Sequence, residues 1–231
     1  MKKMTLLILA LCLVLTGCGK KEEAPAASTQ APGKETVETA PAASAEQADP
    51  AAVINPLPDG TMDNLTDAIL AVSLEEGGAY VDDTGKMQMD VKIYTYDKYD
   101  MVDISLLKVG DIIVTHAGEV EVTSMEQTAA GILINGGLEE GGFDLVTDDS
   151  GIYFETGFND AKNWYEVGEA TIRVSADFQG VDRSDPDKGD VTLYPGSFLV
   201  GEVTNYDFTP YNTTIRVEAG QIVELIRSYT P

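Results

Sequence analysis

From about Asn55 onward, short runs of β-branched and aromatic residues recur at close spacing and are separated by Gly, Asp and Pro. Residues 87–96, MQMDVKIYTY, alternate between polar and apolar positions, as a half-buried strand does. Helical periodicity is nearly absent, and residues 63–74 are the one ambiguous candidate. This spacing predicts an all-β fold, mostly antiparallel, built as a β-sandwich or a barrel-like domain.

The other expected strands follow one another along the chain. They cover residues 111–115, 119–123, 131–135, 143–147, 151–156, 170–176, 191–194, 213–217 and 222–229. The last two are joined by Glu-Ala-Gly-Gln, which predicts a hairpin. The roughly 176 residues of this region are enough for one sizeable hydrophobic core or two small ones.

One pentapeptide, LEEGG, occurs twice, at residues 74–78 and 138–142. Each copy is followed by a similar tetrapeptide, DDTG at 82–85 and DDSG at 148–151. Glycine supplies positive φ where a strand reverses, and the Asp side chains accept hydrogen bonds from nearby backbone N–H groups. Turn chemistry alone therefore predicts a hairpin end after each copy.

The similarity around the two LEEGG copies extends further. Ile-Leu precedes both copies, and Val-Gly followed by an acidic residue comes after both, in the same order. These matches favour a duplicated β unit covering residues 66–129 and 130–189, with Leu74 and Leu138 both in the core. The alternative is that the acidic, glycine-rich composition repeats LEEGG by chance.

At the N-terminus, Lys2 and Lys3 precede an apolar run over residues 4–15, which ends in LTGC at 15–18. The run is far shorter than the roughly 20 residues that span a bilayer. This segment resembles a bacterial lipoprotein signal peptide, with an ordinary secretory signal as the alternative. The resemblance implies that residues 1–17 are removed and that Cys18 carries the lipid.

If Cys18 is lipidated, the chain is anchored to the cell membrane and faces outside the cytoplasm. Residues 18–55 are rich in Ala, Pro, Thr, Ser and Glu and contain no aromatic residue, so we expect a disordered linker. A linker of this length has a typical reach of about 30–35 Å. The folded β domain is therefore expected over residues 56–231.

Cysteine and histidine usage excludes several chemistries. Of the two cysteines, Cys12 leaves with the signal peptide and Cys18 takes the lipid, so the mature domain has no thiol for a disulfide, a zinc–thiolate site or a nucleophile. The single histidine, His116, excludes multi-histidine metal sites. It follows a β-branched run, which indicates a structural position at a strand end.

Acidic residues outnumber basic ones by 39 to 15, which gives a net charge of −24. Nucleic acid is excluded as a partner, because binding to phosphates needs clustered Lys and Arg. Anionic membrane surfaces repel such a chain, so membrane attachment must come from the lipid. Cationic partners, calcium, an envelope protein or a neutral envelope glycan are compatible with this charge.

Calcium is the only cofactor that the sequence suggests, and one loop is a better candidate for it than the acidic residues around the two LEEGG copies. Four carboxylates lie close together there: Asp182, Asp185, Asp187 and Asp190. Pro186 and Gly189 tighten the loop, and crowded carboxylates favour a cation between them. The alternative is a solvated loop in which Arg183 and Lys188 are the partners.

A second candidate site lies in the aromatic segment 152–168. Trp164 and Tyr165 could stack on the apolar face of a sugar, while Asn159 and Asp160 take its hydroxyls. Core packing explains the same aromatics equally well.

Catalysis has weaker support. Two carboxylates can hydrolyse a glycosidic bond without histidine or cysteine, and the nearest candidates are Glu139, Glu140, Asp144 and Glu155. The sequence therefore predicts a lipid-anchored, extracytoplasmic binding or envelope-interaction module, with a glycan hydrolase or a calcium-stabilised surface domain as the alternatives.

Overall fold

The computed structural model describes residues 50–157, 161–199 and 207–230. The expected signal peptide, Cys18 and most of the expected linker lie outside these residues. The described chain is mostly strand with two short α-helices and is all-β in class, as predicted. None of its helices has the length and apolar character that a membrane span requires.

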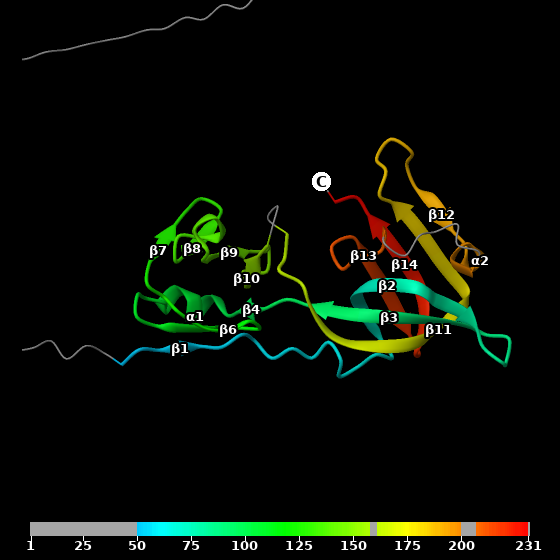
Figure 1. The fold of residues 1–231 in the computed structure, drawn as a ribbon, viewed down its shortest axis with the longest axis horizontal. Helices are drawn as coiled ribbons and strands as arrows, with labels where there is room; N and C mark the ends of the chain where they lie inside the picture. Colours follow the sequence, from blue (N-terminus) through cyan, green and yellow to red (C-terminus); the bar gives the residue numbers. More distant parts are fainter. Residues whose placement is uncertain (1–49, 158–160, 200–206, 231) are drawn as a thin grey trace, which may run out of the picture. The chain divides into compact units, whose positions relative to one another are not determined.

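The largest sheet closes on itself (Figure 1). Its strands are β2 (Ala68–Val81), β3 (Met87–Thr95), β11 (Tyr165–Arg183), β12 (Val191–Leu193), β13 (Thr213–Glu218) and β14 (Gln221–Ser228). The first half of β11 pairs antiparallel with β3, and its second half pairs parallel with β14. Because β13 pairs with β2, the order β2-β3-β11-β14-β13 forms a closed circuit.

This circuit is barrel-like, one of the two architectures predicted. Five strands in this order, with a single parallel pair and the helix α2 (Pro195–Leu199) between the third and fourth strands, match the Greek-key topology of the OB-fold. The interior is apolar and almost free of water-exposed atoms, with Val72, Met89, Ile93, Ile222 and Leu225 at its centre.

The chain between β3 and β11, together with β1 near the start of the described residues, forms two further sheets. One has the order β4-β10-β9-β8-β7 and the other β1-β5-β6. Their strands are β1 (Val53–Ile54), β4 (Lys98–Tyr99), β5 (Ile112–Thr115), β6 (Gly118–Glu121), β7 (Met125–Gln127), β8 (Gly131–Ile134), β9 (Phe143–Thr147) and β10 (Tyr153–Thr156). With the helix α1 (Met101–Leu106) they enclose a second hydrophobic cluster, which includes Tyr99, Ile104, Ile113, Ile134 and Leu145. The chain therefore builds two small cores.

Local sequence explains several of these elements. In β3 the burial alternates from Met89 to Thr95, as the period-two pattern predicted. The helix α1 begins after Asp100, whose side chain accepts a hydrogen bond from the backbone N–H of Val102 at 2.7 Å. Each of the expected strands appears in the structure, although 170–176 is only the middle of the 19-residue β11.

The structure differs from the sequence expectations at two places. Residues 63–74 contain no helix, because their apolar part begins the long strand β2 at Ala68. The expected linker also extends too far, since β1 lies inside it and pairs with β5. The backbone N–H of Ala52 donates to Asp111 at 2.8 Å, so ordered structure begins before residue 56.

The predicted duplication is wrong. The first LEEGG lies within β2, where Leu74 is buried, whereas the second forms the 3₁₀ turn η1 (Leu138–Glu140), where Leu138 is 42% exposed. Strand order and pairing also differ between the two segments, because 66–129 contributes to all three sheets and 130–189 to only two.

The predicted turn chemistry is confirmed. Asp82 and Asp148 each accept a hydrogen bond from the backbone N–H two residues later, and Gly85 and Gly151 have φ values of 76° and 81°. The two tetrapeptides join β2 to β3 and β9 to β10 as hairpins. The expected hairpin between β13 and β14 is also present, with positive φ at both Ala219 and Gly220.

Candidate functional site

A cavity of about 410 Å³ opens on the closed sheet where three neighbouring strands meet. Its walls come from Glu75 to Gly78 of β2, from Asp90 to Lys92 of β3 and from Glu169 to Thr171 of β11. All three strands belong to the barrel-like circuit, so hydrogen-bonded strands form two walls of the cavity.

A bulge in β2 forms the third wall. Leu74 pairs with Val91 and Ala79 pairs with Met89, so four residues of β2 lie opposite the single residue Asp90. A side chain at position 78 would meet the backbone oxygens of Glu75 and Asp90 at 3.0 and 3.1 Å, a close approach that favours glycine there. The first LEEGG therefore builds a cavity wall, whereas the second copy lies outside the cavity.

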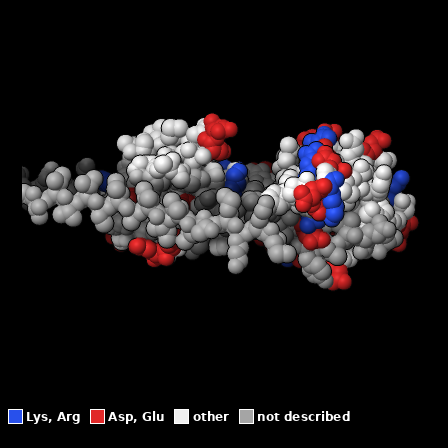
Figure 2. All heavy atoms as spheres, turned by 90° about the horizontal axis from the view of Figure 1, so that it is seen from above, with Lys and Arg blue, Asp and Glu red and all other residues white. Residues whose placement is uncertain are grey.

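The cavity is strongly acidic. Four carboxylates line it, from Glu75, Glu76, Asp90 and Glu169, against the single ammonium of Lys92. On the face drawn in Figure 2, Lys and Arg side chains lie among Asp and Glu side chains on one part of the surface. An acidic concavity bounded by protein concentrates its field on any cation that enters.

Lys92 is the internal cation of this site. Its Nζ lies 2.7 Å from Glu75, 3.7 Å from Glu166 and 3.9 Å from Glu169. The hydrogen bond to Glu75, followed by the charge of Glu166, raises the pKa of the Lys92 ammonium above its ordinary value. The ammonium therefore stays charged, and it marks the kind of group that these carboxylates hold.

The structure does not assemble the predicted calcium site. Asp185 lies 2.7 Å from Lys188, Asp190 lies 3.2 Å from Arg183, and Asp182 lies 3.2 Å from Arg227. The bond from Lys188 lowers the pKa of the Asp185 carboxyl. Burial opposes the same change at Asp182, but hydrogen bonds from Ser184 and Arg227 and the charge of Arg227 outweigh it and lower the pKa of that carboxyl. The four carboxylates, Asp187 included, do not form a group of potential ligands in the described chain, and the solvated-loop alternative accounts for them.

The predicted sugar-binding residues are only partly described. Asn159 and Asp160 lie outside the described residues. Trp164 packs edge-on against Tyr96 with ring centroids 4.9 Å apart, and Tyr165 is stacked on His116. Both aromatic side chains are half-buried and already in contact with other rings, so neither presents an open stacking platform.

The four carboxylates suggested for hydrolysis have separate surroundings. Glu139 and Glu140 are exposed on η1, and Asp144 accepts a hydrogen bond from the backbone N–H of Leu138 at 3.1 Å. Glu155 lies instead beside Asp97 and His116, the one group of at least three potential metal ligands among the described residues.

Sequence reasoning missed this last group. His116 lies directly after β5, as predicted for a strand end, but its neighbours come from distant segments. Burial raises the pKa of the Glu155 carboxyl, while a hydrogen bond from Asn163 opposes that rise. No spacing in the sequence links these residues.

No protein-family model matches the chain, and no curated protein or solved structure shows significant similarity to it. Support for a function therefore has to come from the residues and geometry of this molecule.

Proposed function

We propose that this protein is a lipid-anchored, extracytoplasmic binding module that takes a cationic ligand in the cavity at the β2 bulge. The observation that carries the proposal is the lining of that cavity, where four carboxylates face a single ammonium. A ligand with several ammonium or guanidinium groups, such as an oligoamine or a basic peptide segment, complements this lining.

The position of the cavity supports the same function. It lies on the first three strands of the closed circuit, and OB-fold barrels commonly bind extended ligands across their second and third strands. This is an analogy of fold, and the acidic lining separates the proposed ligand from the nucleic acids that many such barrels bind.

The anchoring part of the proposal comes from LTGC at 15–18 and from the acidic balance of the chain. A lipid on Cys18 would hold the domain at the membrane, and the segment that follows Cys18 would let the domain reach away from the headgroups. A negatively charged domain at that position would attract cationic molecules arriving from outside the cytoplasm.

The two LEEGG copies offer a matched test. Spermidine is titrated by calorimetry into the purified full chain and into two double variants, Glu75→Gln with Glu76→Gln and Glu139→Gln with Glu140→Gln. Both double variants lose the same two charges from the same pentapeptide, but only the first pair lines the cavity. We expect the first to weaken binding by about four- to 25-fold, at about two- to fivefold per exposed charge, and the second to change binding by less than twofold.

A variant that should tighten binding gives the second test. Replacing Lys92 by Met removes the internal cation, so spermidine binding should tighten by about two- to fivefold. Binding should also weaken with added salt, because the partly exposed charges are screened. Equal weakening by both LEEGG double variants would mean that spermidine responds only to net charge, and would reject the cavity as the site.

A further inference from the structure

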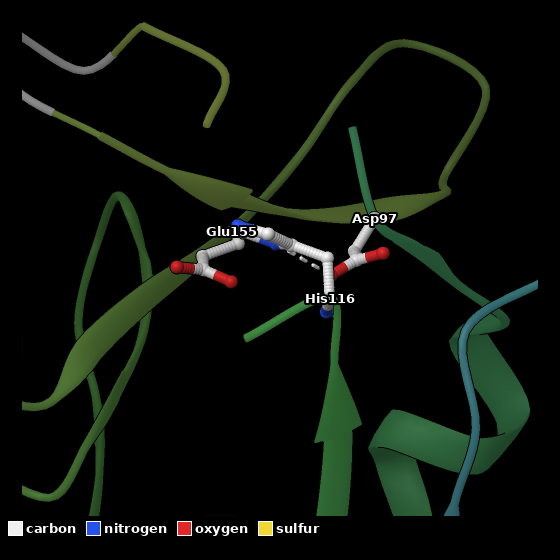
Figure 3. A group of neighbouring side chains, drawn as sticks. All are labelled: Asp97, His116 and Glu155. Carbon is white, nitrogen blue, oxygen red and sulfur yellow. Dashed lines mark hydrogen bonds and ion pairs between the residues drawn. The ribbon is translucent and has the colours of Figure 1, made fainter. Parts of the chain in front are cut away.

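A second site lies away from the cavity, where three side chains from separate segments meet (Figure 3). Asp97 follows β3, His116 follows β5, and Glu155 belongs to β10. One potential ligand atom from each residue lies within 4.8 Å of the other two. The imidazole lies between the two carboxylates.

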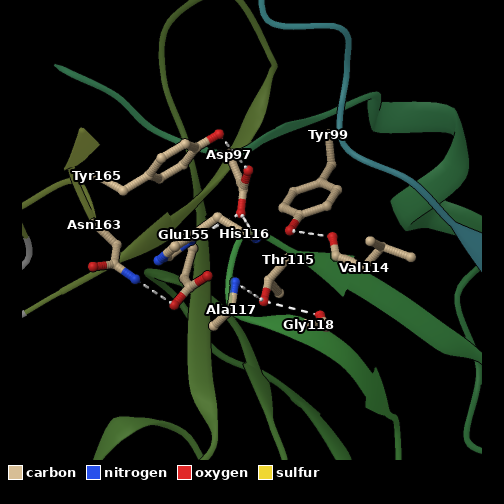
Figure 4. Close-up of polar contacts among 10 residues, drawn as sticks. All are labelled: Asp97, Tyr99, Val114, Thr115, His116, Ala117, Gly118, Glu155, Asn163 and Tyr165. Atoms are coloured by element: carbon tan, nitrogen blue, oxygen red, sulfur yellow. Dashed lines mark hydrogen bonds and ion pairs between the residues drawn. The ribbon is translucent and has the colours of Figure 1, made fainter. Parts of the chain in front are cut away.

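Asp97 and Tyr165 hold the imidazole in place. The Asp97 side chain is 3% exposed, and its Oδ2 accepts a hydrogen bond from the backbone N–H of His116 at 2.7 Å. The same oxygen lies 3.2 Å from Nδ1 of the ring, and Oδ1 accepts from the Tyr165 hydroxyl at 3.0 Å (Figure 4). A histidine ordered through one ring nitrogen by a carboxylate is the usual arrangement around a metal-binding imidazole.

Glu155 points independently to a bound cation at this site. Its Oε1 accepts a hydrogen bond from Asn163 Nδ2 at 2.7 Å. Its Oε2 is buried and has no hydrogen-bond partner among the residues that the structure describes. A buried, unpartnered carboxylate oxygen is unfavourable unless some group compensates it, and a bound cation would do so.

We propose that Asp97, His116 and Glu155 form a binding site for one divalent transition-metal ion of the zinc class. The imidazole and the unpartnered Glu155 oxygen are the direct ligands, Asp97 orders the imidazole through Nδ1, and water or an external donor completes the coordination. Nitrogen in the ligand set favours zinc, copper or nickel over calcium and magnesium, which prefer oxygen alone.

The geometry is within reach of zinc. Ligand atoms of tetrahedral zinc lie about 2.0–2.2 Å from the metal and therefore about 3.4 Å from each other. One potential ligand atom from each of the three residues lies within 4.8 Å of the other two, so their spacing exceeds that of tetrahedral zinc by at most about 1.4 Å. The proposed zinc site is separate from the acidic cavity at the β2 bulge, because the two share no residue.

The test uses the full chain with Cys12→Ser and Cys18→Ser, because these two thiols are the only others that could bind zinc strongly. Chelator-stripped protein is titrated with zinc and, separately, with calcium by calorimetry. We expect one zinc per chain and at least 100-fold weaker calcium binding. Cobalt in place of zinc should give the visible absorption of a low-symmetry nitrogen and oxygen site.

Three variants of this background locate the ion. His116→Gln and Glu155→Gln should each weaken zinc binding by at least 100-fold, and Asp97→Asn by about 10- to 100-fold as an ordering residue. Glu126→Gln, an exposed carboxylate on β7, is the control and should leave affinity unchanged. Circular dichroism of each variant checks folding.

The proposal is overturned if folded Glu155→Gln binds zinc with wild-type affinity. It is also overturned if the parent chain shows no saturable binding of zinc or cobalt, and the three residues would then be only a hydrogen-bonded anchor for β11. The Glu75→Gln and Glu76→Gln double variant should keep its zinc affinity. A result against the zinc site can therefore be told apart from a result against spermidine binding in the cavity at the β2 bulge.

Discussion

The ring of Tyr165 lies parallel to the imidazole of His116, with 4.3 Å between centroids and 13° between planes. Tyr165 is the first residue of β11, and His116 follows β5, so this pair connects the barrel-like sheet to the smaller β1-β5-β6 sheet. The Tyr165 hydroxyl also reaches the buried Asp97.

Tyr165→Phe keeps the ring but removes the hydrogen bond to the Asp97 carboxylate. We expect the free energy of unfolding to fall by about 1.5–3 kcal/mol, because the acceptor is charged and buried. Tyr94→Phe is the matched comparison, since its hydroxyl contacts the neutral Ser73 hydroxyl at 3.1 Å and its loss should cost about 0.5–1.5 kcal/mol. Urea denaturation measures both, and equal losses would show that the Asp97 bond has no special weight.

The DDxG turns allow backbone strain to be separated from crowding. Gly85 and Gly151 have similar positive φ values, but a Cβ at 85 meets no atom, whereas one at 151 meets the Met101 Cε. Each Gly→Ala change should cost about 1–2 kcal/mol from the left-handed conformation. Because the end of a methionine side chain can move, we expect the two losses to agree within about 0.5 kcal/mol. If Gly151→Ala lowers the free energy of unfolding much more than Gly85→Ala does, and adding Met101→Ala removes the difference, the extra loss comes from crowding against Met101.

Asp82 should contribute stability that depends on pH. Hydrogen bonds from the Thr84 hydroxyl, the Lys86 backbone and the Gln88 amide hold the pKa of its carboxyl well below the ordinary range. A depressed folded pKa gives stability that is complete above the unfolded value of about 3.9 and is lost as pH falls through the folded value.

The midpoint of thermal unfolding of Asp82→Asn should therefore lie below that of the wild type at pH 7, and the gap should begin to close below about pH 4. Asp148→Asn changes the equivalent turn, where Ser150 is the main cause of a lowered pKa. Its effect should be smaller, because no bond comparable to that of Gln88 supports it. A gap for Asp82→Asn that stays constant from pH 7 to pH 2 would contradict the ionisation argument.

Cys18→Ala tests the anchor that LTGC predicts. We expect the protein to move from the membrane fraction to the soluble extracytoplasmic fraction, because the acidic domain has no affinity of its own for anionic lipid. Cys12→Ala serves as the control and should leave the protein in the membrane fraction. Fractionation followed by immunoblotting reads the result, and an unchanged distribution of Cys18→Ala would reject lipid attachment at this residue.

The sequence predicted strands best where one face is buried and the other meets water. β3 and β9 follow that rule, and both were predicted within one residue of their observed bounds. β2 was missed because Leu70, Ala71 and Val72 are buried in succession, which removes the alternation, and because EEGG resembles a loop. The closed pairing of β11 with both β3 and β14 depends on contacts between distant segments, which no local pattern encodes.

The sites were less predictable than the strands. LEEGG attracted attention as a repeat, but only the register of β2 against β3 turns one copy into a cavity wall. The predicted aspartate loop has suitable ligands for calcium, yet nearby Arg and Lys side chains pair with three of its four carboxylates. Asp97, His116 and Glu155 are individually unremarkable in sequence and are brought together only by the fold.

The pairing of β2 with β13 also constrains the order in which the molecule can fold. About 140 residues separate Leu70 from its partner Ile215, so the closing contact joins the beginning of the domain to its end. Such distant pairing imposes a large loop-closure entropy before any stabilisation is gained, and it is associated with slow folding. A chain emerging from a translocation channel would hold β2 and β3 as an open hairpin until β13 and β14 had also emerged. Its apolar inner face would stay exposed to other chains during that interval, so an exported chain would be prone to aggregate until β13 and β14 had emerged.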